Sequence, residues 1–242
     1  MNNATLIAAK GTQRVSREVL RSLPVPEATR THQPVSHYQL VVTLIESLGF
    51  RHIQVIHDEY AVSPDGAKMF GVLDLDHEFS GCRFALGIRN ANDKSMRLAM
   101  TAGYRVLVCS NMAFKGDFQP VLAKHSKSFN LADALAVGLD KMQRNFEPIK
   151  RTIEDWKCCC LSDDQVKRII YTAFVEGKLK APNLIRRVHN LYFNPPHEEF
   201  KARTLWSLSN AFTSSFKDLK PVKQFQLTAK LGTFLEDCWM PF

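Results

Sequence analysis

The chain is 242 residues long, 45% hydrophobic and 23% charged, with a formal net charge of +8 at pH 7. A chain of this size and composition buries a core of its own, which excludes a wholly disordered protein, and it has no run of about eighteen uncharged apolar residues, which excludes a membrane-spanning helix. Its first residues lack the layout of a signal peptide and its charge favours polyanionic partners, so we expect a cytoplasmic protein that meets nucleic acid and no membrane.

Three regions follow one another along the chain. Residues 1–33 are expected to form an extended N-terminal arm, because prolines interrupt the segment before Pro34 and no hydrophobic period is visible there. Residues 34–128 have mixed helical and strand-like patterns, which predicts an α+β core domain. Residues 129–242 have helical patterns throughout and predict a helical region packed on that core.

The core domain should open with a helix followed by a hairpin. Ser36 and Gln39 form a capping box ahead of an apolar stripe at helical spacing, which ends at Gly49. Two strand-like runs then flank the sequence SPDG at 63–66, whose proline and glycine fit a type I turn. The two runs cover residues 53–59 and 68–75.

A third strand is predicted over residues 82–88, where apolar residues alternate with others. One face of this strand carries Arg83, Ala85, Gly87 and Arg89. Two small residues between two arginines predict a shallow, positively charged strip that a ligand could approach.

A helix over residues 93–102 and a fourth strand over residues 104–109 complete the core domain. Met96, Ala99 and Met100 give the helix its apolar side, and Gly103 would end it. The element order is then α-β-β-β-α-β, with a mainly antiparallel sheet.

The helical region contains a heptad-like seam, in which apolar residues are spaced alternately by four and three. Pro148 interrupts the seam and should kink its helix. The seam is either core or the contact of a homo-oligomer. Its residues are Leu135, Leu139, Met142, Phe146, Ile149, Ile153 and Trp156. A second capping box, Ser162 with Gln165, opens the next helix, and further helices are predicted around 184–191, 204–216 and 222–236.

Most catalytic motifs are absent. The sequence has no phosphate-binding loop, no dinucleotide fingerprint and no serine-hydrolase elbow, and its six cysteines lack zinc spacing. We therefore expect reduced thiols and no cofactor or metal. The acidic and histidine residues at 57–59 and 74–78 could ligate a divalent cation, but the acidic-x-Lys order of metal-dependent nucleases is missing, and a solvated strand edge explains them more simply.

Three stretches of the chain closely resemble one known family. They are SLGFRHIQVIHDEYAVSPDGAKMFGVLDL, GIRNANDKSMRLAMTAGYRVLVCSNMAFKGD and TLWSLSNAFT. The family is the bacterial and viral domain of unknown function 932, commonly described as phage/plasmid-like protein, and the resemblance runs from about Pro34 to Thr213. It implies a mobile-genetic-element setting and supplies no activity, catalytic residue or cofactor. Ser110 stands where family members often have aspartate.

The sequence GIRNANDKSM, from Gly87 to Met96, is the strongest candidate for a binding site. If a helix starts there, its free N–H groups and positive dipole end would attract a phosphate. A structural alternative stays open, in which Asn92 caps that helix and Arg89 pairs with Asp93. Arg186 and Arg187, ahead of Tyr192 and Phe193, are a secondary candidate. The residues predicted to contact nucleic acid are Arg83, Arg89, Asn90, Asn92, Lys94, Arg97, Lys115, Arg186 and Arg187.

These observations favour a protein that binds nucleic acid without catalysis. Single-stranded DNA is the expected ligand, in an annealing or recombination-like role, because single-strand annealing proteins use a similar sheet-and-helix core with basic residues near the junction. One alternative is an anti-defence or regulatory protein that binds a host protein. A metal-dependent nuclease is the third.

Overall fold

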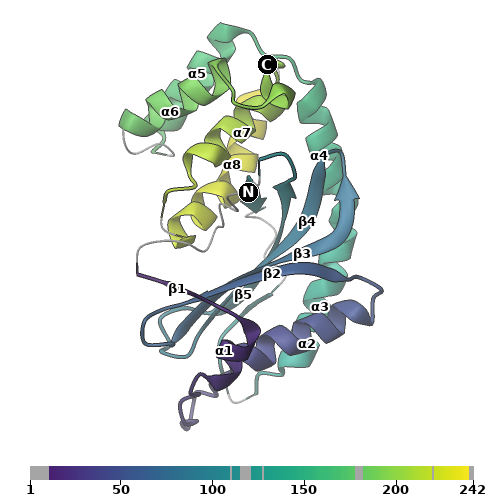
Figure 1. Ribbon diagram of the computed structural model, residues 1–242, viewed down its shortest axis with the longest axis vertical. Helices are drawn as coiled ribbons and strands as arrows, with labels where there is room; N and C mark the ends of the chain where they lie inside the picture. The colour runs from purple at the N-terminus through teal and green to yellow at the C-terminus, as the bar shows by residue number, and fades with distance from the viewer. Residues whose placement is uncertain are drawn as a thin grey trace.

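The computed structural model describes residues 11–109, 111–114, 121–126, 128–177, 182–219 and 221–239. An antiparallel sheet lies in the middle of this part of the chain, and helices gather on either side of it (Figure 1). Its strands follow the order β1-β2-β3-β4-β5-β6, and β7 pairs with the same edge of β5 as β6 does. The strands are β1 (Gln13–Val15), β2 (Val55–Val62), β3 (Lys68–Phe79), β4 (Cys82–Ala91), β5 (Leu98–Val106), β6 (Met112–Phe114) and β7 (Val121–Ala123).

The helices form two groups. The first three lie along one side of the sheet, α4 rises past its edge, and the last four gather on the other side (Figure 1). The expected α+β fold, with a mainly antiparallel sheet followed by a helical C-terminal part, is confirmed. The helices are α1 (Arg17–Ser22), α2 (His37–Gly49), α3 (Leu131–Arg144), α4 (Phe146–Cys158), α5 (Asp163–Val175), α6 (Pro182–Phe193), α7 (Leu205–Ser215) and α8 (Pro221–Trp239), with a short 3-10 turn at Glu198–Phe200.

Elements with local start and stop signals form where the sequence predicts them. The Ser36 side chain accepts a hydrogen bond from the Gln39 backbone N–H at 3.3 Å and caps α2. The Ser162 capping box is complete: the Ser162 side chain accepts from the Gln165 N–H, and the Ser162 N–H donates to the Gln165 side chain at 2.8 Å. Gly66 closes the β2–β3 turn at φ +68°, a value that favours glycine.

The prediction of a helix over residues 93–102 is wrong, because residues 93–97 form a turn and residues 98–102 belong to β5. Lys94 has φ +64°, which an α-helix does not accept, and the Asp93 carboxylate accepts hydrogen bonds from Ser95 in a tight turn. Strand β5 is buried along its whole length and pairs with β4 over residues 99–106. A strand buried on both faces has no alternation, so its apolar residues matched a helical pattern equally well.

The heptad seam belongs to two helices that lie inside the protein. α3 ends and α4 begins around Asn145, and Pro148 falls in the first turn of α4, where its missing N–H costs nothing. Six of the seven seam residues are at most 5% exposed, and Phe146 is partly buried against them. The surface through which we expected an oligomer is therefore part of the core.

Part of the expected N-terminal arm is ordered structure. β1 pairs with β2, and α1 packs on α2. Leu20 of α1 is 1% exposed, and the Arg17 guanidinium lies 2.6 Å from the Asp58 carboxylate. Residues 13–22 thus extend the core, while the division of the chain into regions at residues 34 and 129 stays a prediction.

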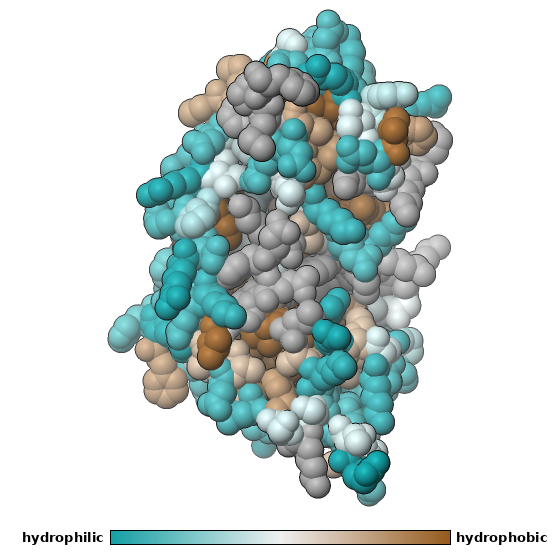
Figure 2. Space-filling model, turned by 180° about the vertical axis from the view of Figure 1, so that it is seen from behind, coloured by the Kyte–Doolittle hydropathy of each residue, from teal (hydrophilic) through white to brown (hydrophobic). Residues whose placement is uncertain are grey.

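The coloured residues on the face seen in Figure 2 are mainly hydrophilic. On the face seen in Figure 2, the hydrophobic residues form small separate groups among hydrophilic ones. Within the described ranges, every helix is too short or too polar to span a lipid bilayer.

A candidate anion-binding pocket

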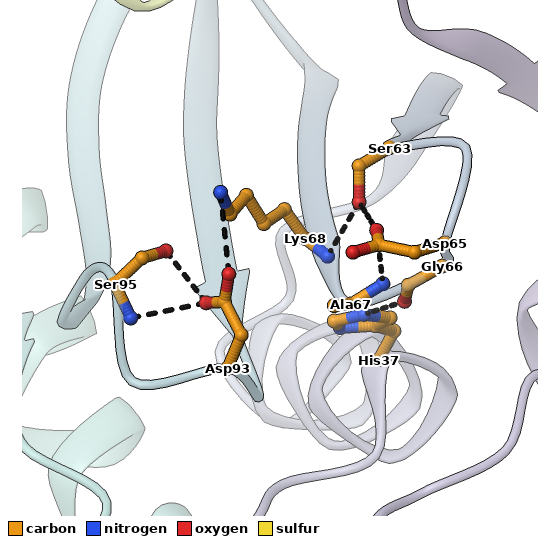
Figure 3. A network of polar contacts seen from close by, with 8 residues as sticks. All are labelled: His37, Ser63, Asp65, Gly66, Ala67, Lys68, Asp93 and Ser95. Atoms are coloured by element: carbon orange, nitrogen blue, oxygen red, sulfur yellow. Dashed lines mark hydrogen bonds and ion pairs between the residues drawn. The ribbon is translucent and has the colours of Figure 1, made fainter.

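Two turns lie side by side at one end of the sheet (Figure 3). The β4–β5 turn is joined to the β2–β3 turn by a 2.9 Å hydrogen bond from the Asn92 N–H to the Ala67 carbonyl and by an ion pair of 3.2 Å between Lys68 and Asp93. Burial raises the pKa of Asp93, but the hydrogen bonds from Ser95 and the Lys68 ammonium outweigh it, and the net pKa is lowered. The Asp93 carboxylate is thus ionised and engaged within the turns.

Two asparagines hold this framework in place. The Asn90 side-chain amide donates to the Val35 carbonyl at 2.7 Å and to Nδ1 of His37 at 2.9 Å, which leaves Nε2 of His37 to donate to the Gly66 carbonyl at 3.0 Å. The Asn92 side-chain oxygen accepts from the Val35 N–H at 3.1 Å. Both asparagines are buried, at 0% and 6% exposure, so neither can reach a polymer as the sequence interpretation required.

A pocket of about 450 Å³ opens beside the β4–β5 turn. Lys94 and Arg97 come from that turn, and Lys124 follows β7. All three side chains are exposed, and none has a hydrogen bond or ion pair with another residue in the described ranges. The described lining residues include no carboxylate. They are Thr31, His32, Ala91, Lys94, Ser95, Met96, Arg97, Lys124, His125 and Ser126.

Two buried histidines line the same pocket. The rings of His32 and His125 are stacked, with centroids 5.4 Å apart and planes 14° from parallel. They are 9% and 6% exposed. Nε2 of His32 and both ring nitrogens of His125 are buried without a hydrogen-bond partner in the described structure. Buried polar groups are nearly always paired, so these nitrogens call for an explanation.

The pKa of His125 is lowered, first by burial and then by the nearby His32 and His37. The ring is therefore neutral near pH 7, with one nitrogen that donates and one that accepts. Leaving such a group unpaired in the interior costs about 1–3 kcal/mol. An anion in the pocket would give these nitrogens a partner.

The two arginines of β4 do not form an open strip. Arg83 forms an ion pair with Glu78. Arg89 is half-buried with no partner in the described ranges, and burial lowers its pKa. Between them, a Cβ atom at Gly87 would lie 2.8 Å from the Phe114 ring. The phenylalanine fills the space where we expected a ligand.

Arg186 and Arg187, on α6, do not line the pocket. Arg187 forms an ion pair with Asp218. Tyr192, one of the two rings that follow these arginines, is 1% exposed. Arg186 lines a groove of about 440 Å³ between α5 and α6, and Lys115 lies outside the described residues. The groove is lined by Lys167, Ile170, Tyr171, Phe174, Ile185, Arg186, His189 and Asn190.

The sequence interpretation missed His32, Lys124 and His125. His32 lies about 60 positions before the β4–β5 turn, and the adjacent Lys124 and His125 lie about 30 positions after it. Only the fold brings these segments together, in part through a 3.0 Å hydrogen bond from the Gln33 N–H to the His125 carbonyl. The one usable signal was the short basic run Lys124-His125-Ser126-Lys127.

The acidic segments do not converge. His57 pairs with Glu59 at 2.9 Å, and Asp74 pairs with Arg105 at 2.8 Å. Among the residues that the structure describes, no three histidine, cysteine, aspartate or glutamate side chains are grouped as a metal site requires.

Comparison with known proteins gave one match. The family model described as domain of unknown function (DUF932) matches residues 31–232, a range that contains all the pocket residues. No curated protein matches the chain, and no solved structure matches it.

Proposed function

We propose, from the premise that this chain belongs to the family described as domain of unknown function (DUF932), that the protein binds single-stranded DNA without catalysis, in an annealing or recombination-like role on a mobile genetic element. The family's description gives no activity, so the support comes from the geometry. The single observation that carries the proposal is the convergence of Lys94, Arg97 and Lys124 on one pocket whose described lining has no carboxylate.

The charges of the pocket suit phosphate groups. A lysine or arginine that neutralises a phosphate releases condensed counterions, which drives binding at low salt. An exposed cation with an acidic neighbour attracts a phosphate less strongly, because its charge is already partly compensated. The net charge of +8 adds a long-range attraction that raises the rate of encounter with DNA.

The size of the pocket favours a single strand over a duplex. A volume of about 450 Å³ is within the range of pockets that hold small molecules, and a nucleotide is such a molecule. A single strand bends enough to insert one nucleotide. A duplex keeps its phosphates on the outside of a stiff rod and cannot do so without unpairing.

Fluorescence anisotropy with a labelled 20-nucleotide single strand, over a series of salt concentrations, tests the proposal. With three phosphate contacts, the slope of log K against log salt should be on the order of −2, and Lys94→Ala with Arg97→Ala should reduce it to about −0.7. Lys141→Ala with Arg144→Ala, on the exposed side of α3, is the matched control with the same loss of charge. No binding, or equal effects of the two double variants, would refute the proposal.

A second function, binding of a host protein in an anti-defence or regulatory role, is favoured by the groove between α5 and α6. Tyr171 and Phe174 line it and are 67% and 39% exposed, and Lys167 and Arg186 lie beside these rings. Aromatic residues and arginine are enriched in protein interfaces. A host protein that is retained at high salt by the wild type but not by Tyr171→Ser with Phe174→Ser would support this function.

A further inference from the structure

We propose that the pocket beside the β4–β5 turn is a site for a phosphate monoester, either the terminal phosphate of a DNA strand or that of a mononucleotide, and that the stacked pair His32 and His125 takes up a proton when the phosphate binds. Where the ligand is the terminal phosphate of a DNA strand, the inference rests on the proposed function. It goes further than that function, because it distinguishes the end of a DNA strand from its interior.

The pocket has more positive charge than one internal phosphate of a DNA strand can neutralise. An internal phosphodiester carries one negative charge, whereas a terminal phosphate carries about −1.5 to −2 near pH 7 and three free oxygens. Lys94, Arg97 and Lys124 surround the pocket without a described carboxylate, and Asp93 is engaged by Ser95 and Lys68. Three converging cations suit a dianion.

The histidines supply the second observation, since they are more than nine-tenths buried and line the same pocket. Their unpartnered ring nitrogens would become donors to phosphate oxygens once the ring is protonated. Two protonated rings stacked at 5.4 Å would repel each other, so the pair should take up about one proton.

The pH dependence follows from the groups that face these rings. The charged groups that line the pocket are Lys94 and Arg97 of the β4–β5 turn and Lys124 after β7. Burial lowers the pKa of His37 of α2, and the other described polar lining residues are Thr31, Ser95 and Ser126. Burial, with the nearby His32 and His37, lowers the pKa of His125, so its ring is neutral near pH 7 in the free protein and gains a proton when an anion lies beside it. Phosphate affinity should therefore fall as the pH rises.

Isothermal titration calorimetry on the full chain tests the inference. The ligands are a 12-nucleotide strand with a 5′-phosphate, a 3′-phosphate or neither, together with thymidine monophosphate and thymidine, at pH 6, 7 and 8. Two buffers of different ionisation enthalpy count the protons. We expect the phosphorylated strands to bind about tenfold more tightly than the unphosphorylated one, with uptake of about one proton at pH 7.

Variants assign the effect to the pocket. Lys124→Ala, at an exposed position, should remove the preference for phosphorylated ligands, and His125→Asn should remove the proton uptake. His52→Asn, at an exposed histidine outside the pocket, is the control. If His125→Asn does not fold, the number of protons taken up by the wild type and the ligand preference of Lys124→Ala still test the inference.

The outcomes separate this inference from the proposed function. Equal affinities for phosphorylated and unphosphorylated strands would overturn the inference and leave DNA binding intact. Binding of thymidine monophosphate without binding of any strand would support the inference and refute the proposed function. A preference for phosphate that Lys124→Ala leaves unchanged, or binding without proton uptake, would overturn the inference.

Discussion

The pocket beside the β4–β5 turn and the groove between α5 and α6 have almost the same volume, about 450 and 440 Å³, but their linings differ in kind. The pocket combines exposed cations with buried imidazole nitrogens that have no hydrogen-bond partner among the described residues. The groove combines exposed aromatic rings with cations at its rim. Volume therefore says little about the ligand, whereas the state of the polar groups separates an anion site from a contact surface.

The two regions also differ in how their side chains are held. The pocket draws on segments around residues 31–32, 91–97 and 124–126, which a buried network of asparagine and histidine side chains and the sheet hold together. The groove lies between neighbouring helices, and its polar side chains lie on their surfaces. A mutation in the framework should therefore damage the pocket and leave the groove unchanged.

The largest expected effect is that of Asn90→Ala. The substitution leaves the Val35 carbonyl and Nδ1 of His37 buried without a partner, so we expect a loss of about 2–4 kcal/mol in the free energy of unfolding, measured by urea denaturation. Phosphate binding should weaken with it. Asn183→Ala, at an exposed position of α6, should change stability by less than about 0.5 kcal/mol. A loss below about 1 kcal/mol for Asn90→Ala would contradict the framework role.

Charge reversal compares the two regions directly. Lys94→Glu with Lys124→Glu should lower the affinity for single-stranded DNA by about 100-fold at low salt, because two attractive contacts become repulsive. Lys167→Glu with Arg186→Glu makes the same change in net charge at the groove and should cost less than about threefold. Anisotropy at fixed salt measures both, and equal losses would show that net charge, not the pocket, governs binding.

The buried histidines should make the free protein sensitive to acid. Burial lowers the pKa of both His37 and His125 below the value of the unfolded chain. The unfolded state then binds more protons as the pH falls through the ordinary histidine range near 6.5, so the free energy of unfolding should fall with it and be fully present at higher pH. Urea denaturation at pH 5.5 and 7.5 measures this, and saturating phosphate should reduce the difference. A free protein that becomes more stable at pH 5.5 would contradict the sign.

The sequence predicted elements with local signals and failed where distant segments decide. The Ser162 capping box and the SPDG turn form as predicted, and Ser36 caps α2 through the one described hydrogen bond from the Gln39 N–H, because each of these stretches has local signals. The segment 93–102 carries none, since an apolar run of this length suits a helix or a buried strand, and pairing with β4 decides.

The sequence predicted only part of the candidate site, for the same reason. Lys94 and Arg97 lie in one conspicuous cluster, but His32, Lys124 and His125 reach the pocket through contacts between distant segments, such as the hydrogen bond from the Gln33 N–H to the His125 carbonyl, that no local pattern encodes. Asn90 and Asn92 looked equally polar in the sequence and turned out to be buried framework.

The smallest effect is expected from Tyr171→Ser with Phe174→Ser in the groove. The two rings are 67% and 39% exposed, so the free energy of unfolding should change by no more than about 0.5–1 kcal/mol, and DNA affinity should stay the same. Tyr192→Ser on neighbouring α6 is the matched control, because that ring is 1% exposed and its loss should cost about 3–5 kcal/mol. If the groove variant instead weakens DNA binding as much as charge reversal at the pocket, then bases stack on these rings, and the two regions would hold one strand together.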